Sequence, residues 1–214
     1  MTDDTAKLQH PRFARTYLRI SEQSERRGAT GHRQRMLAGL TGRVIEIGAG
    51  NGLNFAHYPT TVTEVLAVEP DDTLRAHAEQ AAATAAVPVV VVSGHADRLP
   101  APDRSYDGAV TSLVLCSVPD PSHALTEAAR VLRPGGQLRF YEHVRSANPL
   151  LGRLQDVVTP AWAGFGGGCH PNRDTAAAIR QAGFTIDEVD RFSFRFSPFL
   201  PGMAHIVGRA HKPA

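Results

Sequence analysis

Short apolar runs recur along the chain, separated by longer stretches with helical character. The runs at 44–47, 64–68, 88–92, 106–115 and 137–144 predict five strands. The run at 88–92 is unbroken and β-branched, which predicts a strand buried on both faces. Two further runs at 184–191 and 204–210 predict an antiparallel pair, joined by an aromatic-rich loop that carries Phe192, Phe194, Phe196 and Phe199.

Helical segments fill the spaces between these runs. Residues 10–40 are predicted to be helical, with breaks at Gly28 and Gly31. Shorter helices are predicted at 53–57, from Asp71 or Asp72 to about 85, at 122–132, and from Asp174 or Thr175 to 182. The alternation predicts an α/β fold with a doubly wound sheet and helices on both faces. We expect residues 1–214 to form a single domain, with a less regular stretch at 146–172.

A glycine-rich turn follows the first predicted strand. Glu46 ends that strand, and Gly48, Gly50 and Gly52 come directly after it. Glycine lets the backbone approach a ligand, which a Cβ would block. The second strand ends in Glu69, whose two carboxylate oxygens suit the two hydroxyls of a ribose. The sequence therefore predicts a nucleoside site at the carboxyl edge of a parallel sheet.

The glycine spacing also indicates which nucleoside is bound. Nicotinamide enzymes use Gly-x-Gly-x-x-Gly, with a diphosphate at the helix N-terminus. Here the spacing is Gly48-x-Gly50-x-Gly52, and Glu46 beside the turn would repel a diphosphate. A cationic ligand without phosphates fits better, and S-adenosylmethionine is such a ligand. A nicotinamide oxidoreductase is the alternative that this spacing opposes.

Further motifs identify a resemblance. Val44-Ile45-Glu46-Ile47-Gly48-Ala49-Gly50-Asn51-Gly52, Val68-Glu69-Pro70, Gly94-His95-Ala96, Ser105-Tyr106-Asp107 and Val131-Leu132-Arg133-Pro134-Gly135-Gly136 resemble the motifs of class I S-adenosylmethionine-dependent methyltransferases. The resemblance covers nearly the whole chain. It implies a Rossmann-like seven-stranded sheet of order 3-2-1-4-5-7-6, with S-adenosyl-L-methionine as cofactor and S-adenosyl-L-homocysteine as product.

The resemblance also implies the residues that hold this cofactor. Glu46 would hold the methionine ammonium and Glu69 the ribose, His95 and Ala96 would lie at the adenine, and Leu115 would line the methionine arm. The other expected contacts are Gly48, Ala49, Gly50, Asn51, Gly52 and Pro70. His95 stands where many members of the family have Asp or Asn.

A narrower likeness concerns the methyl acceptor. Leu113-Val114-Leu115-Cys116-Ser117-Val118, Tyr141-Glu142-His143-Val144 and Gly167-Gly168-Cys169 resemble the methyltransferase-like group that methylates alkyl thiols. This likeness implies a small-molecule S-methyltransferase. Two alternatives stay open: transfer to carbon, oxygen or nitrogen of a quinone, phenol or phospholipid amine, and a binding module that retains the fold without turnover.

His143 is the candidate catalytic residue, because an imidazole at the end of the fifth strand can accept a proton near neutral pH. Glu142 would point to the opposite face of the strand. Residues 1–40 are expected to form a helical cap, and residues 145–173 a substrate lid. The expected substrate contacts are Tyr17, Cys116, Trp162, Cys169 and His170, and Arg173 is expected to bind nearby carbonyls.

Composition narrows the class of protein. The 23 Lys and Arg against 21 Asp and Glu leave a formal charge of +2, which does not indicate a nucleic-acid partner. Two cysteines without a CxxC pair predict neither a disulfide framework nor a metal, since Cys169 and His170 alone are too few zinc ligands. Neither a leader nor a membrane span is expected, so we expect a cytoplasmic protein. The oligomeric state is left open.

Overall fold

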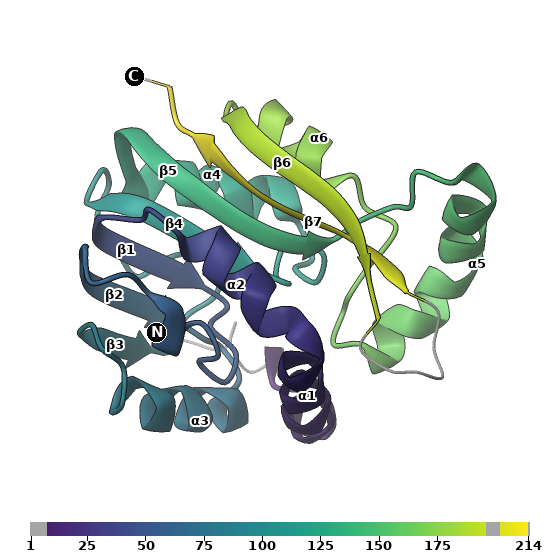
Figure 1. The fold of residues 1–214 in the computed structure, drawn as a ribbon, viewed down its shortest axis with the longest axis horizontal. Coiled ribbons are helices and arrows are strands. Elements are labelled where there is room, and N and C mark those ends of the chain that lie inside the picture. Colours follow the sequence, from purple (N-terminus) through teal and green to yellow (C-terminus); the bar gives the residue numbers. More distant parts are fainter. Residues whose placement is uncertain (1–7, 196–201, 214) are drawn as a thin grey trace.

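A computed structural model describes residues 8–195 and 202–213 of the chain. Within these residues, seven strands form one sheet of order β3-β2-β1-β4-β5-β7-β6 (Figure 1). The strands are β1 (Gly42–Ile47), β2 (Val62–Val68), β3 (Val89–Val92), β4 (Tyr106–Ser112), β5 (Leu132–His143), β6 (Thr185–Phe194) and β7 (Met203–His211). The first five are parallel, and β7 runs antiparallel between β5 and β6. The expected order and the antiparallel pair are confirmed.

Several strand limits differ from the prediction. β3 is an edge strand, and Val90 is 58% exposed, so the expectation of a strand buried on both faces was wrong. β4 ends at Ser112 rather than at 115, because Leu113 has a left-handed backbone with φ of 62°. Phe192 and Phe194 lie in β6 rather than in a loop, while Phe196 and Phe199 fall outside the described residues.

The helices cover both faces of the sheet, as expected. They are α1 (Pro11–Ser24), α2 (Thr30–Leu37), α3 (Asp72–Ala82), α4 (Pro121–Val131), α5 (Pro149–Phe165) and α6 (Thr175–Gln181). A π-helical turn, Glu25–Ala29, joins α1 to α2 and is kinked at Gly28, whereas Gly31 lies inside α2. A 3-10 turn, Phe55–His57, follows the glycine turn. Asp71 caps α3 by accepting hydrogen bonds from the backbone N–H groups of Thr73 and Leu74.

Two apolar layers fix the sheet between these helices. Met36 and Leu37 of α2 pack on one face with Val44, and Leu125 of α4 and Ile179 of α6 pack on the other. Neighbouring residues of β1 alternate between the layers, as a pleated strand requires. Each such side chain contributes about 1.5–3 kcal/mol when it is fully buried. The sheet is therefore a rigid base for the loops at its carboxyl edge.

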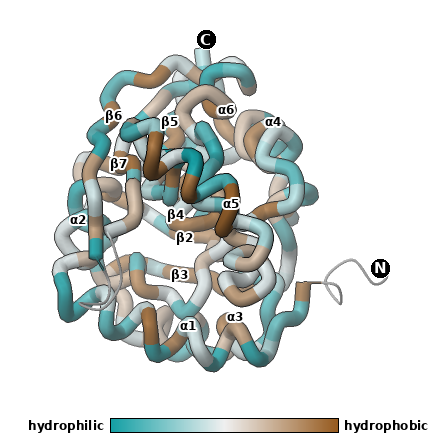
Figure 2. The backbone as a smooth tube through the Cα atoms, turned by 90° about the vertical axis from the view of Figure 1, so that its right-hand side faces the viewer, coloured by the Kyte–Doolittle hydropathy of each residue, from teal (hydrophilic) through white to brown (hydrophobic). Residues whose placement is uncertain are grey.

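The irregular stretch expected at 146–172 is mostly helix. Helix α5 has 17 residues, is capped by Asn148 and contains Pro160. It stands away from the sheet (Figure 1), and it carries several hydrophobic positions (Figure 2). Among these, Leu150 and Val157 are exposed. None of the helices in the described part of the chain combines the length and the apolar character that crossing a membrane requires.

Candidate active site

The carboxyl ends of β1, β2 and β4 surround a cavity of about 410 Å³, here called the glycine-turn cavity. Parallel sheets bind ligands at this edge, where the strand order reverses. Its walls hold seven residues that the sequence analysis predicted to contact the cofactor or the substrate: Tyr17, Gly48, Gly50, Glu69, Pro70, His95 and Ala96.

The glycine turn needs its glycines for packing as well as for approach. Gly48 has φ of +68°, and a Cβ there would lie 2.6 Å from Cγ2 of Val114. Gly52 has φ of +79°, and a Cβ there would lie 2.8 Å from Phe55. A Cβ on Gly50 would only come within 3.5 Å of the Tyr17 ring. The turn is therefore held against the loop after β4, with Gly50 facing the cavity.

Glu69, the predicted ribose residue, lines the glycine-turn cavity. Its Oε2 accepts a 2.7 Å hydrogen bond from the Gly50 N–H, and its Oε1 accepts one of 2.9 Å from the Asp71 N–H. Burial raises the pKa of Glu69 to about 7, against the lowering effect of these two bonds. Each oxygen keeps a further lone pair, so the carboxylate can still accept from a ligand.

Glu46 lies deeper than its predicted role suggests. The side chain is 1% exposed, and its oxygens accept hydrogen bonds from Asn54 (2.8 Å) and Tyr58 (2.6 Å). Burial raises the pKa of Glu46 to about 7. Its partners already use one acceptor site on each oxygen, so Glu46 shapes the floor of the turn. Asn51 lies nearby, and its amide donates to the Ser21 hydroxyl.

One side chain that the sequence analysis missed lies at the expected adenine end. Asp97 lines the glycine-turn cavity beside His95 and Ala96. Its Oδ1 is buried and has no hydrogen-bond partner within the described residues. A buried acceptor without a donor costs free energy until a ligand supplies one. Asp97 could have been suspected, because it follows His95 by two positions.

Leu115 does not lie where the sequence analysis expected it. Its side chain is 1% exposed and belongs to the core, and its carbonyl accepts a 2.7 Å hydrogen bond from Arg173. Leu113 lines the cavity instead. The difference arises because β4 ends two residues earlier than predicted, and the left-handed backbone of Leu113 turns the loop.

A second cavity of about 340 Å³, here called the apolar cavity, adjoins the first. It lies between α1, α5 and the ends of β5, β6 and β7, and its walls are largely aromatic and aliphatic. Among these wall residues are Ile20, Trp162, Phe165, Phe194 and Met203. Four residues line both cavities: Phe13, Tyr17, Leu113 and Ser117. The two cavities therefore lie next to each other.

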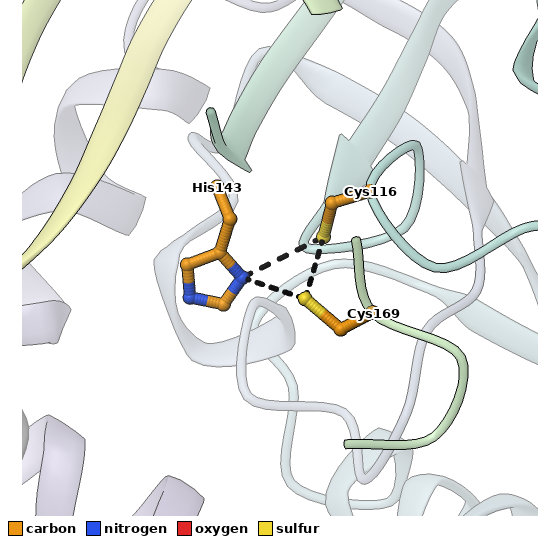
Figure 3. A group of neighbouring side chains, drawn as sticks. All are labelled: Cys116, His143 and Cys169. Atoms are coloured by element: carbon orange, nitrogen blue, oxygen red, sulfur yellow. Dashed lines mark hydrogen bonds between the residues drawn. The ribbon is translucent and has the colours of Figure 1, made fainter. Parts of the chain in front are cut away.

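His143 faces two sulfur atoms at the end of the apolar cavity (Figure 3). Its Nδ1 lies 3.3 Å from the Sγ of Cys169 and 3.6 Å from the Sγ of Cys116, and the two sulfurs are 3.7 Å apart. The interaction between the thiols lowers the pKa of Cys169 and raises that of Cys116, to which burial adds.

The remaining predicted substrate residues divide into two groups. Tyr17, Trp162 and Cys169 line the apolar cavity, whereas Cys116 lies fully buried behind it. His170 points elsewhere, with its Nδ1 2.6 Å from the Gly168 carbonyl. His205 was missed by sequence reasoning and lines the cavity, with its ring centroid 4.5 Å from that of His143. Burial lowers the pKa of His205 to about 3, so this ring is neutral.

The buried Glu142 and the partly buried Arg173 hold the loop that carries Cys116. Glu142 accepts hydrogen bonds from the backbone N–H groups of Val114, Leu115 and Cys116. Arg173 donates to the carbonyls of Leu115 and Val118, both at 2.7 Å, as expected. Glu142 was set aside as a partner of His143, and its position under the loop explains why an acid is needed there.

The chain is similar to known methyltransferases. A family model described as a methyltransferase domain matches residues 45–140. The thiol S-methyltransferase TMT1B of Rattus norvegicus is 35% identical over 177 residues, which are 79% of this chain and 70% of that protein. TMT1B of Homo sapiens is 34% identical, over 82% of this chain and 74% of that protein. A solved Thermotoga maritima structure, described as a methyltransferase and possible histamine N-methyltransferase, has a TM-score of 0.70 at 26% identity, covering 94% of this chain and 96% of that one.

Proposed function

Because the chain belongs to the class I S-adenosylmethionine-dependent methyltransferases, the family of the thiol S-methyltransferases, we propose that it transfers a methyl group to the sulfur of a small apolar thiol. One observation carries the acceptor assignment. The apolar cavity shares a wall with the glycine-turn cavity, and it ends at His143 and two sulfurs.

The residues of the glycine-turn cavity fit the cofactor. Glu69 has lone pairs for both ribose hydroxyls, and the unpartnered Oδ1 of Asp97 suits the adenine amine. Gly50 faces the cavity without a side chain. Glu46 acts on the methionine end through the turn that it supports. When bound, S-adenosylmethionine supplies a methyl group that is already activated, so the protein has mainly to align the acceptor.

Two parts of the chain enclose the acceptor in this proposal. The cap at residues 1–40 contributes Phe13 and Tyr17 of α1 to both cavities. The lid at residues 145–173 contributes Trp162 and Phe165 of α5 to the apolar cavity. Because Phe165 is 85% exposed, a bound thiol would cover apolar surface of this lid.

His143 promotes the loss of the thiol proton. A free thiol has a pKa near 8.5, so only a small fraction is ionised at neutral pH. The neutral His205 ring beside His143 adds no positive charge to this end of the cavity. The two thiols of the chain, which lie 3.7 Å apart, support a reducing compartment such as the cytoplasm.

A methyl-transfer screen tests the proposal. Labelled S-adenosylmethionine is offered with alkyl thiols, phenols, quinones and amines, and the methylated product is identified by mass spectrometry. Alkyl thiols are expected to give the highest kcat/KM, and His143→Ala is expected to lower kcat while binding of S-adenosylhomocysteine, measured by calorimetry, stays nearly unchanged. Preferred methylation of a phenol, quinone or amine would reassign the acceptor. Cofactor binding without any methyl transfer would support a binding module.

A further inference from the structure

The contacts around His143 form a closed triangle. Its Nδ1 and the sulfurs of Cys116 and Cys169 all lie within 4.8 Å of one another (Figure 3). The three separations are 3.3, 3.6 and 3.7 Å. A chain of hydrogen bonds would need only two short contacts, whereas here the third side is short as well. The three atoms can therefore all contact a single ion placed between them.

These separations match the ligand edges of a zinc site. Zinc binds Cys sulfur at about 2.3 Å and His nitrogen at about 2.0–2.1 Å in a tetrahedron, which places two sulfurs roughly 3.8 Å apart and sulfur and nitrogen roughly 3.6 Å apart. We propose that Cys116, His143 and Cys169 bind a zinc ion, and that the fourth position on this ion takes the sulfur of the acceptor thiol. The sequence analysis missed this site because it considered only Cys169 with His170.

The backbone holds the three ligands in place from three segments. Cys116 is fixed by Glu142 through its N–H and by the N–H of His170 through its carbonyl, at 2.6 Å. Gly168 has φ of +83°, and a Cβ there would lie 2.8 Å from the Ser117 carbonyl oxygen. A side chain at 168 would thus push Cys169 away from the other two ligands. Such preorganisation is what a metal site requires.

The charge and the exposure of the cluster also suit zinc. Two thiolates and a neutral imidazole cancel the charge of Zn²⁺, which allows burial in an apolar wall. Cys116 is 0% exposed, whereas His143 and Cys169 line the apolar cavity. The open position of a three-ligand site therefore faces the cavity, as in catalytic rather than structural zinc sites.

The metal would convert the acceptor thiol into a thiolate, which is the nucleophile of the reaction. The thiol sulfur forms a bond to zinc and releases its proton to solvent, because a coordinated thiol is deprotonated. A sulfur lone pair then forms the bond to the methyl carbon. The bond between that carbon and the donor sulfonium breaks, and its electron pair stays on the donor sulfur. This step rests on the proposed function, whereas the metal site rests on the three side chains alone.

Metal analysis of the whole chain tests the site. The protein is purified under reductant without metal-chelating resin, assayed for bound zinc, and stripped and titrated with Zn²⁺ and Co²⁺. We expect one metal per chain and a sulfur-to-cobalt absorption band. Cys169→Ser and His143→Ala are expected to weaken Zn²⁺ binding by at least about 100-fold, while His123→Ala, an exposed histidine on α4, leaves it unchanged. Retained binding of S-adenosylhomocysteine confirms that each variant is folded.

The outcomes separate this inference from the proposed function. An alkyl thiol is expected to shift the cobalt band, and removal of zinc is expected to lower kcat for thiols. Failure of the wild-type chain to bind Zn²⁺ or Co²⁺ would overturn the metal site. Metal binding with full thiol methylation by the stripped protein would overturn the role of zinc while the proposed function stands. Metal binding without methylation of any thiol would overturn the proposed function and leave the site.

Discussion

The hydroxyl of Tyr58 donates a 2.6 Å hydrogen bond to Glu46, and both side chains are fully or almost fully buried beneath the glycine turn. Burial raises the pKa of Glu46 to about 7, above its ordinary value of 4.5. Between these two pH values the folded chain keeps a proton that the unfolded chain has lost. The contribution of Glu46 to stability is therefore greatest below pH 4.5 and declines as pH rises to about 7.

Glu46→Gln is expected to remove this decline. The free energy of unfolding of the wild type should fall between pH 5 and pH 8 by roughly 2–3 kcal/mol more than that of the variant. Urea unfolding of both proteins at the two pH values measures the difference. Glu69 titrates in both proteins, so its contribution cancels in the difference between their free energies of unfolding. Parallel pH profiles would show that Glu46 is ionised in the folded chain throughout this range.

Gly48→Ala and Gly50→Ala form a matched pair in the same turn. Both positions have positive φ, but a Cβ on Gly48 meets Val114 at 2.6 Å while one on Gly50 meets Tyr17 at 3.5 Å. Gly50→Ala should cost about 1 kcal/mol of stability, from its backbone alone. Gly48→Ala should cost about 1–3 kcal/mol more. Val114→Ala should restore part of the Gly48→Ala loss, and equal losses for the two single variants would contradict the packing argument.

Arg173 is expected to stabilise the loop after β4. Arg173→Ala removes two partly buried hydrogen bonds to the carbonyls of Leu115 and Val118 and should lower the free energy of unfolding by about 1–3 kcal/mol. Arg173→Lys keeps the charge and one donor direction, so it should recover part of this loss. Thermal unfolding at constant pH measures both. A lysine variant no better than alanine would assign the effect to the planar guanidinium.

Asp97 is expected to recognise the adenine amine. Asp97→Ala should weaken binding of S-adenosylhomocysteine about tenfold, because it removes one acceptor. Asp97→Asn keeps an oxygen and should lose less. The penalty of Asp97→Ala should disappear with S-inosylhomocysteine, which lacks the amine. Calorimetry with both ligands makes this comparison, and a penalty that persists would show that Asp97 acts on the fold instead.

The apolar cavity predicts a dependence on acceptor length. Each methylene that an alkyl thiol buries against Trp162 and Phe165 contributes about 0.8 kcal/mol, so kcat/KM should rise about fourfold per carbon until the cavity is filled. Trp162→Ala should flatten this slope while leaving the cofactor affinity intact. A charged thiol of similar size should be a poor acceptor. A flat series in the wild type would place the acceptor chain outside this cavity.

Regular patterns made much of this fold predictable. The apolar runs gave the strands in their order, and Glu46, Gly48, Gly50 and Glu69 lie around one turn. β3 was predicted as a strand, but its burial was mispredicted because a β-branched run does not reveal whether a strand lies at the edge. Leu115 was chosen over Leu113 because the left-handed residue that ends β4 is a leucine, which gives no local signal.

The sulfur–imidazole cluster could not be predicted in the same way. Cys169 and Cys116 lie 26 and 27 positions from His143 along the chain, so no local sequence spacing connects the three residues. They meet because Glu142 and the glycines before Cys169 hold two loops at the end of β5. Tertiary packing sets this geometry, and only the folded backbone reveals it.

The residues that line both cavities tolerate substitution less freely than the residues that line only one. Phe13, Tyr17, Leu113 and Ser117 touch both ligand spaces, so changing any of them alters donor and acceptor at once. Trp162 and Phe165 border the acceptor space, and their helix α5 stands away from the sheet. Directed evolution toward new thiols should therefore begin in this helix, where libraries can be broad without sacrificing donor affinity.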